Sequence, residues 1–425
     1  MKFIHAADLH LDSPFAGLTD VPEQIQQPVH QSTLTAFKRI VTAAIQKKVD
    51  FVLLVGDNFD TPRHSAAASD FFAQQLSRLN DADIPVVLSY GNHDFVSSTD
   101  QVAFPSNVQV FGRDVTTVHL QTHDKETVDI SGFSYNQRWL TDDPLGDYPE
   151  RRGADWSIGT LHGALETGSG DHYAPFKLAE LLAKHYDYWA LGHIHAPQLL
   201  SKDPAVLYSG TSQGRNVNES GPHGYQLVES NDGKLVPHFH AISPVEWNTL
   251  TIKAAGQSSL ADLAVKISAE ADKLSTPADG GSDDLNQNDI RNHPFTVDYQ
   301  PGLRMITIKI VGQELPASLQ TQINEGALLS WLQKQALEAD QINWWPVTVQ
   351  LLTDESNDRS QALDAPAWQE AAESVFTDTV LADLSSKLVK DYPVLADQLN
   401  QPTTMQALKQ RATDLLRGGG ASDED

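Results

Sequence analysis

Histidine, aspartate and asparagine residues gather at five points of the sequence, each where an apolar run ends. The five stretches are ADLHLD, GDNFD, GNHD, LHG and LGHIH. The candidate ligands within them are Asp8, His10, Asp57, Asn92, His162, His193 and His195. Imidazole nitrogens and carboxylate or amide oxygens suit divalent ions such as Mn²⁺, Fe²⁺ or Zn²⁺. The pattern therefore predicts a metal centre.

Seven ligands are too many for one tetrahedral ion, and they fit two ions that share a bridging carboxylate. Asp8 and His10 stand two residues apart, as do His193 and His195, so each pair shares a face where the backbone is extended. Two such ions can activate water and stabilise both the attacking and the leaving oxygen of a phosphate ester. The chemistry predicted is metal-assisted hydrolysis of phosphate esters.

One histidine of the third stretch, His93, is better suited to the substrate than to a metal. It follows Asn92 in SYGNHDF, so Asn92 can bind an ion while His93 points toward the phosphate. An imidazole in that place can give a hydrogen bond or a proton to the leaving group. The plain alternative is that Gly-Asn is ordinary turn chemistry. The order, type and spacing of the whole set favour the catalytic interpretation.

Other polar residues near these stretches have open interpretations. Asp12 and Asp94 either orient ligands as hydrogen-bond acceptors or cap a helix or a turn. His5 lies inside the first apolar run, and we expect it to pack in or beside the first strand.

The elements that must hold these residues alternate between strand and helix over the first ~250 residues, which is typical of an α/β domain. Strands are predicted over 2–7, 50–55 and 84–90, and helices over 34–48 and 66–79. VDISGF, WSIGTLHG, YDYWALG and AVLYSG indicate further strands, and residues 224–240 a hairpin. In an open α/β sheet, ligands gather beyond the carboxyl ends of the strands, which is where the five stretches lie.

The chain after residue 247 has a different character. Residues 248–355 are predicted to form a small α+β domain with helices over 259–273 and 327–339, interrupted at about 275–300 by an acidic loop rich in Gly, Asp, Asn and Ser. Residues 363–417 have a helical pattern, and 418–425 form an acidic tail predicted to be disordered. The prediction is thus a first domain over 1–247 with two smaller regions behind it.

The composition narrows the class of protein. The chain has 425 residues, of which 40% are hydrophobic and none is cysteine. There is no apolar run near the ~20 residues of a membrane-spanning helix and no signal-peptide pattern, so we predict a cytoplasmic protein without membrane contact. The net charge is −26, so the chain as a whole repels phosphate. Contact with DNA would need metal ions, a locally basic groove or a partner.

In this order, the motifs D-x-H, G-D-x-x-D, G-N-H-D, H-G and G-H-x-H resemble those of the calcineurin-like metallophosphoesterases. With DLHLDSPF, GDNFD and a long C-terminal region, the sequence is most similar to SbcD-type DNA repair exonucleases, in their YhaO branch; the motifs cover about residues 1–212. The resemblance implies an α/β fold: a four-layer sandwich of two sheets with flanking helices. A small α+β capping domain that helps to grip DNA and C-terminal helices would follow.

The resemblance also implies a role for each site residue. The two ligand sets are Asp8, His10 and His195 for one ion and Asn92, His162 and His193 for the other. Asp57 would bridge the ions, and His93 would be the catalytic histidine. Asp60 matches a position that is histidine in some relatives, so its catalytic role is open. Mn²⁺ is the favoured metal, with Fe²⁺ or Zn²⁺ as alternatives.

Family members usually form homodimers and work with an SMC-like, coiled-coil ATPase of the SbcC type, so the resemblance implies these partners and a docking role for residues 363–417. The predicted function is a two-metal phosphodiesterase that acts on DNA as an exonuclease in repair. One alternative is a phosphoesterase for small substrates such as nucleotides. Another is a non-catalytic scaffold of an ATPase complex, against which the complete ligand set argues.

Overall fold

The computed structural model describes residues 1–15, 18, 21–95, 104–166, 172–254, 259–274, 289–292, 294–311 and 315–352. The predicted helical region 363–417, the tail 418–425 and most of the predicted acidic loop lie outside these residues. The chain divides into two compact units, one formed by residues 1–252, 257–309 and 316–350 and the other by 253–256, 310–315 and 351–425. The domain limits drawn from the sequence stay a prediction.

A seven-stranded sheet holds the first three predicted strands. Its order is β14-β12-β11-β1-β2-β3-β4. The strands are β1 (Lys2–Ala6), β2 (Phe51–Val55), β3 (Val86–Ser89), β4 (Val108–Val110), β11 (Gly224–Asn231), β12 (Lys234–Ala241) and β14 (Thr296–Val297). Strands β1 to β4 pair in parallel, whereas β11 and β12 form the predicted antiparallel hairpin. The carboxyl ends of β1, β2 and β3 therefore lie at one edge.

A six-stranded sheet holds the other predicted strands. Its order is β5-β6-β7-β8-β10-β9. The strands are β5 (Thr116–Gln121), β6 (Thr127–Gly132), β7 (Trp156–His162), β8 (Tyr188–Gly192), β9 (Gln198–Lys202) and β10 (Ala205–Tyr208). Strands β6, β7, β8 and β10 pair in parallel, so their carboxyl ends also share one edge.

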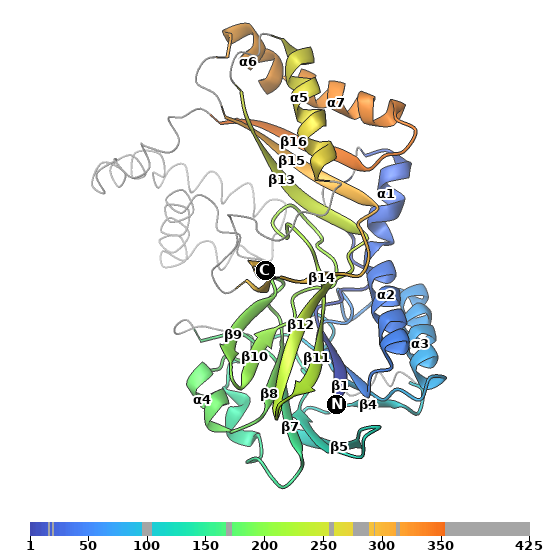
Figure 1. Ribbon diagram of the computed structural model, residues 1–425, viewed down its shortest axis with the longest axis vertical. Coiled ribbons are helices and arrows are strands. Elements are labelled where there is room, and N and C mark those ends of the chain that lie inside the picture. Colours follow the sequence, from blue (N-terminus) through green and yellow to red (C-terminus); the bar gives the residue numbers. More distant parts are fainter. Residues whose placement is uncertain are drawn as a thin grey trace, which may run out of the picture. The chain divides into compact units, whose positions relative to one another are not determined.

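The two sheets pack face to face, and helices cover their outer faces (Figure 1). Alternate residues of β2 show why: Phe51, Leu53 and Val55 join the core between the sheets, whereas Val52 and Leu54 pack with α2 (Ser32–Lys47) and α3 (Ala66–Asn80). The outer face of the second sheet packs with α4 (Leu178–Ala183). Strands buried on both faces read as continuous apolar runs. The predicted four-layer α/β fold is confirmed.

The remaining described elements form an α+β arrangement. Strands β13 (Val245–Lys253), β15 (Leu303–Val311) and β16 (Trp344–Leu352) make a three-stranded sheet in the order β13-β15-β16. Three helices accompany it: α5 (Leu260–Lys273), α6 (Ala317–Asn324) and α7 (Ala327–Glu338). The structure confirms the helices predicted over 259–273 and 327–339, and α6 is an addition. Short 3-10 helices span Pro144–Asp147 and Ile290–Asn292. No helix in the described part of the chain is long and apolar enough to cross a membrane.

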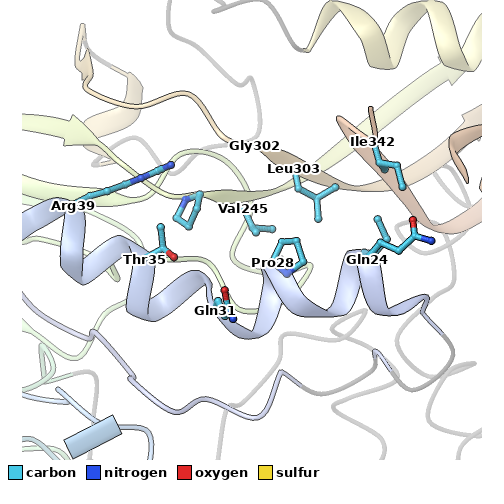
Figure 2. A pocket seen from close by; sticks show the side chains of 11 residues that line it. Gln24, Pro28, Gln31, Thr35, Arg39, Val245, Gly302, Leu303 and Ile342 are labelled. Atoms are coloured by element: carbon cyan, nitrogen blue, oxygen red, sulfur yellow. The ribbon is translucent and has the colours of Figure 1, made fainter. Parts of the chain in front are cut away.

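Helix α1 (Glu23–His30), which the sequence did not predict, packs Ile25 and Val29 into a cluster with Trp247 and Leu303. Beside this cluster lies a cleft of about 260 Å³ lined from α1, α2 and β15 (Figure 2). None of the seven candidate ligands lines it. The candidate chemistry is therefore elsewhere, at the shared edge of the two parallel sheets.

Candidate metal centre

Five parallel strands deliver the candidate ligands. Asp8 and His10 follow β1, Asp57 follows β2, and Asn92 follows β3. In the second sheet, β7 ends at His162 itself, and β8 leads into the remaining two histidines. The carboxyl ends of parallel strands meet at one edge, so residues up to 187 positions apart in the sequence come together.

The backbone at these strand ends takes conformations that side chains rarely allow. Asp8, His10, Asp57 and His193 have φ values of 51°, 43°, 49° and 101°. Positive φ is uncommon outside glycine and stores strain, which tends to gather at functional sites. Four of the seven candidate ligands therefore have a positive φ. The backbone of these loops is held in conformations that it would not prefer by itself.

Gly91 shows how little space separates the strand ends. A Cβ atom on this residue would lie 2.2 Å from Asp57 Oδ1 and 2.7 Å from His162 Nε2. Both contacts are far shorter than real Cβ atoms allow, and both partners are buried. Only glycine lets the third strand approach the ligands of the other strands.

The first predicted ligand set lies together. His10 Nε2 and His195 Nε2 are 3.1 Å apart. Asp8 places a carboxylate oxygen within 4.8 Å of ring nitrogens of both. The backbone N–H of His193 donates to both Asp8 oxygens, at 3.0 and 3.1 Å, and so fixes that carboxylate.

The second set meets around Asn92. Its Oδ1 atom lies 3.0 Å from His162 Nε2 and 3.2 Å from His193 Nδ1. Asp57 Oδ2 lies 3.3 Å from His162 Nε2 and 4.0 Å from His10 Nε2, so this carboxylate stands between the two sets. The structure thus brings all seven candidate ligands together, with Asp57 between the two sets.

The donor set fits divalent cations. Four imidazoles, two carboxylates and one amide oxygen converge, and most of these side chains are fully buried. Buried carboxylates are costly unless a cation or strong hydrogen bonds compensate them. These nitrogen and oxygen donors match Mn²⁺, Fe²⁺ or Zn²⁺ and do not distinguish among them. The cluster is able to hold metal.

Hydrogen bonds to groups outside the cluster orient two of the histidine rings. His162 Nδ1 donates to the carbonyl oxygen of Val55 at 3.1 Å, and His195 Nδ1 lies 2.8 Å from Glu219 Oε1. An acceptor at Nδ1 puts the ring's proton there and leaves Nε2 with its lone pair toward the cluster. Both rings are therefore held in the tautomer that binds a cation through Nε2.

The pKa shifts of the candidate ligands indicate that protons compete with a cation for this site. Burial lowers the pKa of His193 to about 3, with His162 adding to the effect. Although burial opposes it, Asp57 and Asp8 raise the pKa of His162 itself to about 9. Burial favours a raised pKa for Asp57, yet His162 and His93 bring it below the usual range. Because ligands must be deprotonated, a cation that binds here displaces protons.

His93 lies at the edge of the cluster. Its ring stands edge-on to His10, with centroids 4.9 Å apart, and its backbone N–H donates to Asp57 Oδ1 at 2.8 Å. His93 Nδ1 lies 2.8 Å from the carbonyl oxygen of Asp60, which can only accept, so Nδ1 carries the proton. The side chain is only partly buried.

Asp60, the second predicted catalytic residue, faces a neighbour that sequence reasoning missed. Arg215 donates from one guanidinium nitrogen to Asp60 Oδ1 at 2.8 Å and from another to Glu219 Oε1 at 3.2 Å. Asp60 Oδ1 also lies 3.4 Å from His10 Nδ1. Arg215 and Glu219 therefore support both sides of the cluster. The stretch GRNVNES that holds them carries no periodic pattern and no metal motif, so the sequence offered no signal.

The open question about Asp12 and Asp94 is answered differently for each. Buried Asp94 accepts the backbone N–H groups of Asp57, Asn58 and Gly91 at 2.7 to 3.2 Å, so it holds two ligand loops together. Asp12 accepts the N–H of Ser65, the residue that caps α3. His5 lies in β1 as expected, is fully buried, and bonds to Tyr188 and Leu191 of the second sheet.

Comparison with known proteins finds a family match in the first part of the chain. Residues 1–197 match the family described as calcineurin-like phosphoesterase. All seven candidate ligands lie within this matched region, since the last of them, His195, precedes residue 197.

Three curated relatives extend the comparison beyond the matched region. The chain is 38% identical over 256 residues to the uncharacterized metallophosphoesterase YhaO of Bacillus subtilis, covering 59% of this chain and 63% of that protein. It is 25% identical over 275 residues to the DNA double-strand break repair protein Mre11 of Methanopyrus kandleri, covering 58% of each. It is 23% identical over 258 residues to the SbcD component of the nuclease SbcCD of Bacillus subtilis, covering 52% of this chain and 64% of that one. The chain thus spans less than two thirds of each relative.

Proposed function

We propose that this chain is a two-metal phosphodiesterase that hydrolyses DNA phosphodiester bonds, as an exonuclease in DNA repair. The observation that carries the proposal is the convergence of seven nitrogen and oxygen ligands beside a histidine held by a backbone carbonyl. The match of residues 1–197 to the calcineurin-like phosphoesterase family supports metal-dependent hydrolysis. The similarity to Mre11 and to the SbcD component of SbcCD supports DNA as the substrate and the SbcD-type assignment.

In this proposal the ligands divide as the sequence predicts. The sets are Asp8, His10 and His195 for one ion and Asn92, His162 and His193 for the other, with Asp57 between them. Two divalent ions, Mn²⁺ by preference, would supply positive charge for the phosphate and would activate water. The chain's own contribution is to hold the ligands apart from solvent and to fix their tautomers through Val55 and Glu219.

His93 is the proposed catalytic residue. Its Nδ1–H donates to the carbonyl oxygen of Asp60, so in the protonated ring the second proton sits on Nε2. That proton can pass to the leaving oxygen of the substrate, a contribution of roughly 10²- to 10⁴-fold for a well-placed general acid. Asp60 acts through His93 and Arg215 and is a positioning residue in this scheme.

The net charge of −26 supports a partner in the proposed function. An SMC-like coiled-coil ATPase of the SbcC type would supply much of the DNA-binding surface, with docking through residues 363–417. A homodimer and a cytoplasmic location complete the proposal.

The test is hydrolysis of a linear DNA duplex by the purified chain with Mn²⁺. Parallel reactions contain EDTA, the His93→Ala variant, and bis(p-nitrophenyl) phosphate as a small diester. The matched control is His238→Ala, because His238 is exposed on β12. We expect shortening of DNA from its ends, which EDTA abolishes, His93→Ala slows by roughly 10²- to 10⁴-fold and His238→Ala leaves unchanged.

Other outcomes identify the alternatives. Cleavage of the small diester alone, also when the ATPase partner is added, would keep the site and replace DNA with a small substrate. Metal binding without cleavage of either substrate would contradict the enzyme and leave a scaffold. DNA cleavage by His93→Ala at the rate of the parent would contradict the role given to this histidine.

A further inference from the structure

Four consecutive exposed residues follow β6 in the second sheet, between buried Tyr135 and partly buried Leu140. They are Asn136, Gln137, Arg138 and Trp139. The Trp139 side chain is 54% exposed, which is unusual for so large an apolar group. The guanidinium carbon of Arg138 lies 5.5 Å from the centre of the Trp139 ring, a cation–π arrangement. The segment thus presents an indole and a positive charge side by side to solvent.

The start of this segment is anchored on one candidate ligand. Tyr135 is 1% exposed, and its ring stands perpendicular to that of His162 with centroids 5.6 Å apart. Its backbone N–H donates to the carbonyl oxygen of Tyr90 at 3.1 Å, just before the loop that carries Asn92. Tyr135 therefore cannot shift without disturbing the metal centre.

The end of the segment is anchored on a second ligand of the same set. The Leu140 N–H donates to the carbonyl oxygen of His172 at 2.8 Å, and its own carbonyl oxygen accepts from Ala174 at 2.7 Å. Between these two partners stands Tyr173, whose ring lies 4.6 Å from that of His193. The exposed residues are thus held between two tyrosines that each contact a ligand histidine.

These anchors limit how far the indole lies from the reaction centre. Trp139 follows Tyr135 by four positions, and an extended chain covers at most ~3.5 Å per residue, so their Cα atoms lie within about 14 Å. Successive phosphates of a duplex strand rise ~3.4 Å along the helix axis. A nucleotide a few positions from a phosphate at the metal centre is therefore within reach of Trp139.

The chemistry of the segment favours a base over an apolar protein surface. An aromatic face stacks on any base and tolerates every sequence. The neighbouring side chains are two amides and a guanidinium rather than the contiguous apolar groups of a protein-binding patch. In a chain of net charge −26, a guanidinium held on the indole also offsets the repulsion of a phosphate backbone.

We propose that Arg138 and Trp139 form a nucleobase-stacking subsite beside the metal centre, which takes a base of the DNA strand whose phosphate is hydrolysed. The inference rests on the proposed function and adds the element that recognises the polymer. Trp139 touches the substrate away from the scissile bond, so it contributes to binding of DNA and not to the chemical step.

The test compares Trp139→Ala and Trp139→Phe with Trp331→Ala in the full chain with Mn²⁺. Trp331 is the matched control, since it is 43% exposed on α7. We expect Trp139→Ala to raise KM for a DNA oligonucleotide about tenfold, the loss of one stacked base, with kcat unchanged. Hydrolysis of bis(p-nitrophenyl) phosphate, which has no base, should not change. Trp139→Phe should restore most of the loss, and Trp331→Ala should behave as the parent.

A binding measurement separates the inference from the proposed function. Each tryptophan change is placed in the His93→Ala background, and affinity for a fluorescent oligonucleotide is measured by anisotropy. An abasic oligonucleotide should bind to the His93→Ala protein weakly. Its affinity should equal that of the intact oligonucleotide for the double variant with His93→Ala and Trp139→Ala. If the double variant binds the intact oligonucleotide with the same affinity as His93→Ala alone, the stacking subsite is refuted. DNA cleavage by the parent would in that case still support the nuclease proposal. Absence of any DNA binding by the parent chain, also when the ATPase partner is added, would overturn both.

Discussion

Replacement of Glu219 by glutamine tests whether the groups around the ligands tune the metal centre. Glu219 is buried, and its carboxylate bonds to three donors: His195 Nδ1 at 2.8 Å, the Arg215 backbone N–H at 2.7 Å and the Arg215 guanidinium at 3.2 Å. Glutamine keeps the shape but offers one acceptor and one donor group. One of the N–H partners must then face an amide N–H, and the charge that supports His195 is gone.

The expected loss of metal affinity follows from the role of Glu219, whose carboxylate orients a ligand histidine. Removal of a residue that orients a ligand histidine costs roughly 10- to 100-fold in metal affinity. Although burial lowers the pKa of His195, Glu219 raises it above its ordinary value. The parent therefore holds a proton on His195 to higher pH, and its metal affinity falls more steeply as pH drops. In Glu219→Gln that competition weakens, so the loss of affinity should be larger at pH 8.5 than at pH 6.5.

The assay is calorimetric titration of the metal-free chain with Mn²⁺ at the two pH values. Glu229→Gln is the matched control, because Glu229 pairs with Lys2 on β1, away from the ligands. A circular-dichroism melt shows that each variant is folded. The reasoning is refuted if folded Glu219→Gln binds Mn²⁺ at pH 8.5 with the affinity of the parent.

Three further perturbations test other parts of the site and fold. His93→Ala should lower kcat by roughly 10²- to 10⁴-fold and leave calorimetric Mn²⁺ affinity unchanged; a loss of metal would make His93 a ligand instead. Gly91→Ala should lose bound metal by elemental analysis, because its Cβ would lie 2.2 Å from Asp57 Oδ1, whereas Gly112→Ala meets nothing within 4 Å and should keep it. Burial lowers the pKa of His5 to about 3, so the unfolded chain takes up a proton below pH 6.5 and stability falls as pH drops, by about 1 kcal/mol per unit. His5→Gln should flatten that fall in urea unfolding at pH 6 and 4.5, and an equal slope in both proteins would contradict it.

The sequence predicts the ligands because each lies within a few residues of a strand that it also predicts. Strands buried on both faces produce runs such as FVLLV, and the polar residues that follow them stand out. Parallel pairing then brings Asp8, Asp57 and Asn92 to one edge without further information. Their convergence with His162 needs the second sheet to face the first, which the family resemblance supplied and local pattern could not.

The sequence did not predict the elements and contacts that depend on tertiary packing. Helix α1 contains Pro28 and buries only Ile25 and Val29. Two buried positions are too few to show a helical period, so the segment cannot be distinguished from a loop in the sequence. Arg215 reaches Asp60 across 155 positions, and no local pattern marks an ion pair of that span. Such partners are fixed by the folded positions of two loops, so single-sequence reasoning finds the ligands and misses their supports.

On the proposed function, the charge of the metal centre accounts for how an acidic chain can act on a polyanion. Five carboxylates, those of Asp8, Asp57, Asp60, Asp94 and Glu219, face one guanidinium, that of Arg215, so without ions and with neutral histidines the site carries a formal charge of −4. Two divalent cations would bring +4 and offset it, because bound ions are the largest local charges in such a site. The rest of the chain repels DNA at long range. The same ions that serve the chemistry would therefore also remove the repulsion between the centre and a phosphate, and binding elsewhere on the surface would depend on a partner or on cationic groups such as Arg138.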